Sequence, residues 1–265
     1  MVEIDWLNLD GAYADRESAI TIGVFDGLHL GHQALIAQVV HSGRMPVVVT
    51  FQRHPTELLL HDDIPGFIMS LRQKRTMLRK LGVEVAVQID FTESVRSMPG
   101  SVFLERLDAS FLIRLMAVGY DFRCGYGLDT NVDGIRAYFA GRAVEVIPVE
   151  PVTIGAAPVS STRIRRLICE GRLDEAASLL GRPYTLDVAD EEIERDDRRL
   201  YVVKSEGGLL PESRQLLPPA GLYPAELLGA RNTRQTTLEI GENSLSWPLA
   251  ADETIRYIVL HKSRN

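Results

Sequence analysis

Two histidines three positions apart, His29 and His32, form the pattern in this sequence that is best suited to chemistry. They stand in Thr21-Ile-Gly-Val-Phe-Asp-Gly-Leu-His-Leu-Gly-His-Gln33, a Gly-rich passage between an apolar run and a helical one. In a sharp turn that enters a helix, both imidazoles can face one anion, Gly31 lets a phosphate approach the backbone, and the helix amino-terminus adds its dipole. Zinc would need a third ligand, which the sequence does not place. The pattern therefore favours a phosphate site over the alternative, two surface histidines around a glycine turn.

A second candidate segment, Val159-Ser-Ser-Thr-Arg-Ile-Arg-Arg166, combines hydroxyl groups with a basic helix start. Ser160 is in one interpretation only the N-cap of a helix. Arg163 and Arg165, however, fall in the first turns, where cations oppose the helix dipole and need a negative partner. Hydroxyls, free backbone amides and guanidinium groups together suit a polyphosphate.

Alternating strands and helices are expected to position these segments. Residues 18–25 predict a buried strand, and a helix begins near Gln33. The alternation continues with strands at 47–51, 85–89, 115–119 and 144–148, and with helices near 70–81, 100–110 and 132–140. It is typical of an α/β fold, a doubly wound parallel sheet with helices on both faces, which binds ligands at the carboxyl edge of its strands. Two helices follow near 160–169 and 173–180, the second closed by Gly181 and Pro183.

The last 80 residues have a different pattern of apolar and polar residues. Short apolar runs separated by Gly, Pro and charges predict antiparallel strands at 200–203, 221–226, 236–240 and 255–260. We therefore expect two domains, residues 1–185 and a small barrel-like or sandwich-like β domain at 186–265. A unit of this size is marginal unless it packs on the first.

Composition narrows the possible partners. The chain is 45% hydrophobic and 25% charged, and its net charge of -7 argues against nucleic acid, whose phosphates need a basic face. It has no run of about 18 apolar residues, and acids stand near Met1 where a signal peptide would carry bases, so we expect no membrane span and a cytoplasmic location. Cys124 and Cys169 cannot form a disulfide framework, so both are predicted to be structural thiols. The oligomeric state is not predicted.

Taken in order, the motifs resemble those of the prokaryotic FAD synthetases, which join an FMN adenylyltransferase module to a riboflavin kinase module. The resemblance covers about residues 18–184. It is carried by the histidine turn, Phe51-Gln-Arg-His-Pro55, Gly119-Tyr-Asp-Phe-Arg-Cys-Gly125, Val159 to Arg165, Glu170-Gly171, Ala176-Ala177 and Leu180-Gly-Arg-Pro-Tyr184. It implies the nucleotidylyltransferase α/β fold and transfer of AMP from ATP to FMN with loss of pyrophosphate. Mg²⁺ would be carried mainly by the ATP phosphates.

The resemblance also implies roles for individual residues. His29 and His32 would stabilise charge on the α-phosphate, and Ser161, Thr162 and Arg165 would hold the departing pyrophosphate. The residues implied to bind ATP are Gly23, Val24, Phe25, Asp26, Gly31, His32, Asp121 and Arg163, and those implied to bind the flavin are Phe51, His54, Pro55 and Phe122. Phe51 and Phe122 are equally compatible with plain core positions.

Departures from the family pattern keep two alternatives open. Arg53, Cys124, Leu128 and Thr130 replace residues that are usual in the family near the flavin side. The chain is therefore predicted to be an FAD synthase, the alternatives being a non-catalytic nucleotide- or flavin-binding paralogue and a nucleotidylyltransferase for another small phosphate. Leu216-Leu-Pro-Pro-Ala-Gly-Leu-Tyr223 resembles a strand entry of the kinase module, but the kinase's Pro-Thr-Ala-Asn segment is absent, so riboflavin kinase activity is predicted to be absent.

Overall fold

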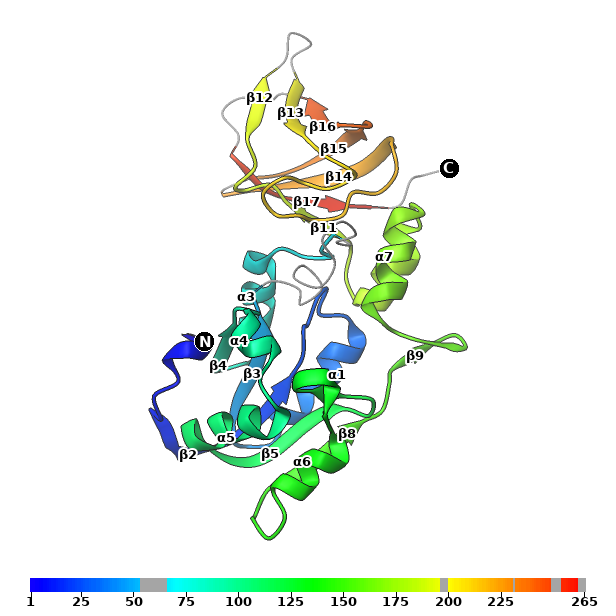
Figure 1. Cartoon of the computed structure of the whole chain (residues 1–265). Helices are drawn as coiled ribbons and strands as arrows, with labels where there is room; N and C mark the ends of the chain where they lie inside the picture. Colours follow the sequence, from blue (N-terminus) through cyan, green and yellow to red (C-terminus); the bar gives the residue numbers. More distant parts are fainter. Residues whose placement is uncertain (53–65, 196–199, 231, 249–253, 262–265) are drawn as a thin grey trace. The chain divides into compact units, whose positions relative to one another are not determined.

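A parallel six-stranded sheet organises the first part of the chain in the computed structural model, which describes residues 1–52, 66–195, 200–230, 232–248 and 254–261. Its strands are β1 (Val2–Asp5), β2 (Tyr13–Ile22), β3 (Met45–Phe51), β4 (Val85–Ile89), β5 (Phe111–Gly119) and β8 (Glu145–Val149). They lie in the order β1-β4-β3-β2-β5-β8, and every neighbouring pair is parallel (Figure 1). The predicted α/β class is confirmed.

The strand order reverses at β2. Later strands of the chain lie on both sides of it, β3 on one side and β5 on the other. At such a switch point the connections from neighbouring strands leave toward opposite faces, which opens a crevice at the carboxyl ends of the strands. The histidine turn (residues 23–32) begins directly after Ile22, the last residue of β2, and therefore stands at this crevice.

Helices between the strands complete this layer. They are α1 (Leu30–Val40), α3 (Leu71–Lys80), α4 (Glu93–Arg96), α5 (Gly100–Ser110) and α6 (Val132–Tyr138), with short 3-10 turns at Trp6–Asn8 and Tyr126–Leu128 and a small β6–β7 pair at Arg123–Cys124 and Thr130–Asn131. Trp6 stacks on Phe103 of α5 with ring centroids 4.8 Å apart. The core beneath the sheet is built from branched aliphatic residues of the strands and apolar residues of α5 and α6.

Two helices and an antiparallel sheet make up most of the rest. Helix α7 (Ser161–Cys169) begins at the N-cap Ser160, whose hydroxyl accepts a hydrogen bond from the Arg163 amide at 3.3 Å. Helix α8 (Leu173–Leu180) ends at Gly181, which has the left-handed conformation, φ 71°. The capping interpretation of Ser160 is thus confirmed.

The carboxyl-terminal sheet is antiparallel and seven-stranded. Its strands are β11 (Thr185–Asp187), β12 (Ile193–Arg195), β13 (Leu200–Lys204), β14 (Gly221–Gly229), β15 (Thr233–Ile240), β16 (Ser244–Pro248) and β17 (Ile255–Leu260), and they lie in the order β11-β17-β14-β15-β16-β13-β12. The sheet curls into a half-barrel around buried residues such as Leu227, Leu238 and Trp247. Two short strands, β9 (Thr153–Ile154) and β10 (Ala157–Pro158), pair separately before α7.

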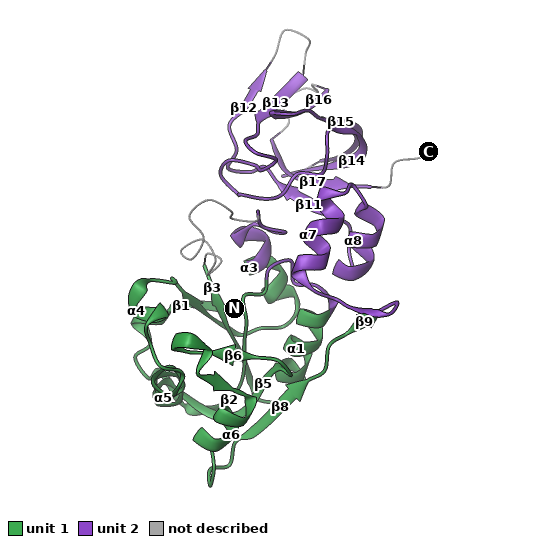
Figure 2. Cartoon of the chain, turned by 45° about the vertical axis from the view of Figure 1, so that its right-hand side comes forward, with its two compact units in different colours: residues 1–25, 31–64, 75–153 green, residues 26–30, 65–74, 154–265 purple. Residues whose placement is uncertain are grey.

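The chain forms two compact units, shown in different colours in Figure 2. Unit 1 comprises residues 1–25, 31–64 and 75–153, and unit 2 comprises residues 26–30, 65–74 and 154–265. The antiparallel sheet starts at Thr185, and the division into domains at residue 185 stays a prediction. Within the described ranges, no helix is long and apolar enough to cross a membrane.

Candidate active site

The histidine turn has an unusual backbone. Phe25 and Leu28 have positive φ angles of 52° and 39°, and Gly27 between them has φ 79°. Side chains other than glycine rarely adopt this conformation, and each such residue costs of order 1 kcal/mol or more. Strain of this kind persists only where surrounding contacts fix the backbone, and it gathers at functional sites.

Neighbouring strands fix the first part of the turn. The Gly23 amide donates to the carbonyl of Val49 in β3 at 3.0 Å, and the Thr50 hydroxyl donates to the carbonyl of Val24 at 3.1 Å. The Phe25 ring then folds back over Gly23, so that a Cβ at Gly23 would lie 3.0 Å from the ring. A side chain at position 23 would therefore press on the Phe25 ring, which would have to move by a few tenths of an ångström.

The two histidines have different environments. His32 lies in the first turn of α1, and its ring meets that of Phe25 edge to face at a centroid distance of 5.2 Å. His29 is only 6% exposed. Burial lowers the pKa of His29 to about 4, and the positive charges of Arg182 and Arg165 lower it further. At neutral pH His29 is therefore an uncharged imidazole, able to donate one N–H to an incoming anion.

An ion pair joins the start of α7 to the histidine turn within unit 2. Arg165 Nη2 lies 2.6 Å from Asp26 Oδ2, and the two side chains are 13% and 4% exposed. Both carboxylate oxygens of Asp26 also accept from the Ile68 amide, at 3.1 and 3.2 Å. The Ser161 hydroxyl donates to the Asp26 carbonyl at 3.0 Å, and Arg165 Nε donates to the Gly66 carbonyl at 3.2 Å. The structure thus brings together Asp26, Ser161 and Arg165, which the sequence analysis had placed in separate segments.

Two further cations belong to this cluster, and sequence reasoning missed both. Arg182 Nη2 donates to the Gly27 carbonyl at 2.6 Å, and its Nη1 donates to the Leu28 carbonyl at 3.3 Å. Burial lowers the pKa of Arg182 to about 10. Lys74 of α3 is 7% exposed, and burial lowers its pKa to about 8 although Asp26 opposes that shift. Arg182 stands in the Leu180 to Tyr184 motif, which was a usable signal, whereas nothing marked Lys74 among the charges of its helix.

The charges of this cluster do not balance. Arg165 pairs with Asp26, whereas every hydrogen bond from the Arg182 guanidinium to a described residue ends on a carbonyl oxygen. Arg182 thus adds a buried positive charge beside the turn, which the Asp26–Arg165 ion pair does not offset. A buried excess of positive charge is costly unless an anion completes it, so the arrangement favours an anionic ligand.

The other predicted residues of α7 are partly engaged elsewhere. Arg163 donates to the carbonyls of Ile154 and Ala157 at 3.2 and 3.1 Å, which holds the β9–β10 connection against the helix start. Thr162 is exposed and available to a ligand. A contact of Arg163 with ATP stays a prediction, and its described bonds give it a structural role as well.

The predicted flavin residues that the structure describes lie in unit 1. Phe51 and Phe122 pack on the hydrophobic core, and Phe51 meets Phe91 edge to face at 5.7 Å. This packing agrees with the core interpretation of both rings, and flavin contact stays a prediction. Asp121 is exposed one residue before Phe122. The other residues of interest on this side, Arg53, His54 and Pro55, lie outside the described residues.

The three remaining departures from the family pattern surround the β6–β7 pair. Burial raises the pKa of the Cys124 thiol to about 12, and the charge of Asp129 adds to that shift, so the thiol stays protonated, as expected for a structural cysteine. Leu128 is 57% exposed with φ 58°. The Thr130 hydroxyl donates to Asp129 at 2.9 Å. Across the part of the chain that the structure describes, no three His, Cys, Asp or Glu side chains gather closely enough to hold a metal ion.

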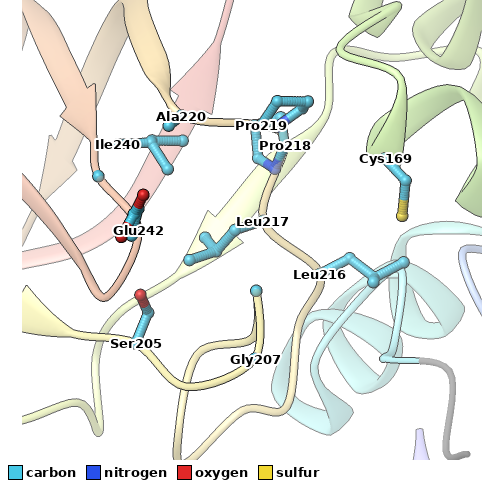
Figure 3. Close-up of a pocket in the computed structure, with 12 residues that line it drawn as sticks. Cys169, Ser205, Gly207, Leu216, Leu217, Pro218, Pro219, Ala220, Ile240 and Glu242 are labelled. Atoms are coloured by element: carbon cyan, nitrogen blue, oxygen red, sulfur yellow. The ribbon is translucent and has the colours of Figure 1, made fainter.

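Unit 2 contains a cavity of about 420 Å³ between the antiparallel sheet and the segment that precedes β14. Figure 3 shows the Ser205 hydroxyl, the Leu217 side chain and the Glu242 carboxylate around this space. Gly207 and Gly208 form a tight hairpin at its edge, with φ angles of 56° and 74°. The residues that line the cavity include one carboxylate and no Lys, Arg or His. The lining of this cavity therefore offers no positive charge that would attract phosphate.

The buried state of His29 predicts a pH dependence of stability. Because the pKa is about 4 in the folded chain and near 6.5 when unfolded, the unfolded state takes up the proton first as the pH falls. The contribution of neutral His29 to the free energy of unfolding is fully present above pH 6.5. It falls by about 1.4 kcal/mol per pH unit as the pH drops toward 4. Between pH 7 and 5, wild type is expected to lose about 2 kcal/mol more unfolding free energy than His29→Gln.

Urea unfolding at both pH values measures this difference. His41→Gln, which alters an exposed histidine just after α1, serves as the matched control and should follow wild type. Equal losses in wild type and His29→Gln would show that His29 is protonated as easily in the folded as in the unfolded chain.

A strained, histidine-bearing turn at the switch point of a parallel sheet, followed by a small β domain, defines the chain as an enzyme of the nucleotidyltransferase class. Residues 12–163 match the family model for FAD synthetase. The chain belongs to the FAD synthetase family.

Relatives with established names agree with this assignment. The chain is 29% identical to a bifunctional riboflavin kinase/FMN adenylyltransferase of Listeria monocytogenes, over 87% of this chain and 74% of that protein. It is 25% identical to an FAD synthetase of the same organism, over 91% of this chain and 94% of that protein. A solved structure titled macrolide-efflux protein, from Streptococcus pneumoniae, has the same fold, with a TM-score of 0.80 at 22% identity over 98% of this chain and 89% of that chain.

Proposed function

We propose that this protein transfers AMP from ATP to FMN and so forms FAD and pyrophosphate. The observation that carries the proposal is the pair of guanidinium groups at the histidine turn: Arg165 pairs with the Asp26 carboxylate, while Arg182 donates to the carbonyls of Gly27 and Leu28. The names of the related proteins, FAD synthetase and riboflavin kinase/FMN adenylyltransferase, supply the substrates. ATP and FMN are the proposed partners, and the cytoplasm is the proposed location.

In the proposed reaction a phosphate oxygen of FMN attacks the α-phosphorus of ATP in line. The new bond from that oxygen to phosphorus forms as the bond to the bridging oxygen breaks, and the electron pair leaves with pyrophosphate. No covalent enzyme intermediate is needed, so catalysis depends on positioning and charge stabilisation. Mg²⁺ would arrive on the ATP phosphates and neutralise part of their charge.

The residues of the turn and those of α7 would bind different phosphates of ATP. His29 and His32 would donate hydrogen bonds to oxygens of the α-phosphate, where charge develops. His29 starts uncharged, and the arriving anion raises its affinity for a proton. Ser161, Thr162 and Arg165 would hold the departing pyrophosphate at the start of α7, where free backbone amides favour anions.

Incubation of the pure protein with ATP, Mg²⁺ and FMN, followed by chromatographic separation of FAD from FMN, tests the proposal. Formation of FAD and pyrophosphate in equal amounts is the expected result. ATP binding without turnover would favour a non-catalytic paralogue. AMP transfer to a different phosphorylated acceptor, with FMN left unused, would favour a related nucleotidylyltransferase.

We also propose that the protein does not phosphorylate riboflavin. The Pro-Thr-Ala-Asn segment of the kinase family is absent, and the 420 Å³ cavity beside the antiparallel sheet is lined by no basic side chain. Riboflavin with γ-labelled ATP is expected to yield neither labelled FMN nor FAD, while FMN with ATP yields FAD in the same preparation. Enzyme-dependent transfer of label to riboflavin would show that unit 2 is an active kinase.

A further inference from the structure

Arg182 occupies a fixed position at the end of α8. Gly181 closes the helix in the left-handed conformation, and the Arg182 amide donates to the Ala177 carbonyl at 3.2 Å. The guanidinium also donates to the Leu180 carbonyl at 3.2 Å. The backbone amide is thus fixed at the helix end, and the same Nη1 that contacts Leu180 also reaches the histidine turn.

The tip of Arg182 spans two successive peptide groups of that turn. Nη2 lies 2.6 Å from the Gly27 carbonyl oxygen and Nη1 lies 3.3 Å from the Leu28 carbonyl oxygen. These carbonyls belong to residues with φ 79° and 39°, within the strained part of the turn. A planar fork of donors can hold both at once, which a single ammonium group cannot do.

We propose that Arg182 is a positioning residue for AMP transfer, whose guanidinium holds the strained turn in the conformation that presents His29 to the nucleotide. Its catalytic consequence rests on the proposed FAD synthase activity, whereas its effect on the turn does not. The Leu180 to Tyr184 motif marks Arg182 in the sequence, but it does not distinguish this role from that of a surface arginine. The contacts to two carbonyls of the turn are what make the distinction.

The charge of Arg182 gives a second effect that can be measured without turnover. After burial, Arg182 is the largest cause of the lowered pKa of His29, and Arg165 contributes less. The other charged groups of this cluster are Asp26, which pairs with Arg165, and Lys74 of α3. Removing the Arg182 charge should therefore raise the pKa of His29, although burial keeps it below the ordinary value.

Three variants distinguish the effect of the Arg182 charge, the effect of its two-donor guanidinium geometry, and a general effect on stability. Arg182→Gln removes the charge, and Arg182→Lys keeps it but loses the fork. Arg172→Gln is the matched control, because Arg172 stands just before α8, is half exposed and pairs with Glu170 and Glu175 rather than with the turn. Each variant is compared with wild type by near-UV circular dichroism, by NMR titration of His29 assigned with His29→Gln, and by steady-state kinetics.

Arg182→Gln is expected to raise the pKa of His29 by half a unit or more and to lower kcat at least thirtyfold. Arg182→Lys should leave that pKa within 0.2 units of wild type and lower kcat about tenfold, since it loses one of the two contacts with carbonyls of the turn. Arg172→Gln should match wild type in all measurements. If Arg182→Gln fails to fold, a tenfold loss of kcat in folded Arg182→Lys still supports the proposal, and near-normal kcat there overturns it.

A folded Arg182→Gln protein with an unchanged His29 titration and kcat within threefold of wild type would also overturn the proposal. The two proposals fail in different ways. If wild type forms no FAD, the proposed function fails, while the titration of His29 in the variants still decides whether Arg182 sets the state of the turn.

Discussion

His32→Ala is expected to lower the rate of FAD formation at least a hundredfold while the protein stays folded. His32 lies in the first turn of α1, held edge to face against Phe25 at 5.2 Å, so its ring is oriented before substrate arrives. Removal of one preorganised donor to developing charge typically costs about 10²–10³ in rate. FAD is measured by chromatography under saturating ATP and FMN, and folding by the urea midpoint.

His41→Ala is the control for His32→Ala, because His41 is exposed immediately after the same helix. It should retain wild-type activity. If folded His32→Ala formed FAD at more than a tenth of the wild-type rate, the phosphate role of His32 would have to be abandoned in favour of a packing role against Phe25.

Arg165→Lys is expected to lower kcat/KM for ATP at least thirtyfold. The Arg165 guanidinium reaches Asp26 at 2.6 Å and the Gly66 carbonyl at 3.2 Å at the same time, and a lysine ammonium cannot reproduce this two-sided fork. Lysine is the informative substitution because it keeps a cation beside the buried Asp26. Alanine would leave that carboxylate without its cation, at a cost of about 3–5 kcal/mol in stability, and would confuse unfolding with lost binding.

Arg166→Lys, at the next position of α7, provides the comparison for Arg165→Lys. The Arg166 side chain is 66% exposed, and its Nε lies 3.8 Å from Glu170 Oε1. ATP affinity from equilibrium binding and kcat from FAD formation should be unchanged in this variant. Equal kinetics for Arg165→Lys and wild type would reduce the α7 segment to a capped structural helix.

The parallel sheet could be predicted from sequence because its strands are continuous apolar runs between helices of ordinary length. The predicted helix at 100–110 coincides with α5, and that at 173–180 coincides with α8. Strand β1 was missed because it is a four-residue edge strand that begins at Val2 with exposed residues. Strand β2 begins at Tyr13, five residues before the predicted start, because its first half is charged and faces solvent.

The candidate site could be predicted only where its residues are close in sequence. The spacing of His29 and His32 and the run of hydroxyls before Arg165 are local signals. The ion pair from Asp26 to Arg165 joins positions 139 residues apart, and no local pattern predicts such a partner. Asp26 was predicted to bind ATP, but its carboxylate is 4% exposed and engaged by Arg165. A direct contact with ATP stays a prediction for this residue.

The reversal of strand order at β2 could not be derived from the sequence either. Helix and strand periodicity gives the succession of elements, whereas the order of strands depends on pairing between distant segments. The resemblance to FAD synthetases supplied that information indirectly, since it implied a known fold. The structure adds the reason why the histidine turn follows β2 and no other strand.

Unit 2 is assembled from three stretches of chain, residues 26–30, 65–74 and 154–265. No single cleavage of the polypeptide can therefore release either unit intact. A fragment that ends at residue 153 carries two stretches that have lost their partners, and one that starts at 154 lacks the Asp26 carboxylate and the Gly27 carbonyl that Arg165 and Arg182 contact. Dissection of this protein by truncation should yield aggregation-prone halves, and recombination between homologues should succeed only when all three stretches come from the same parent.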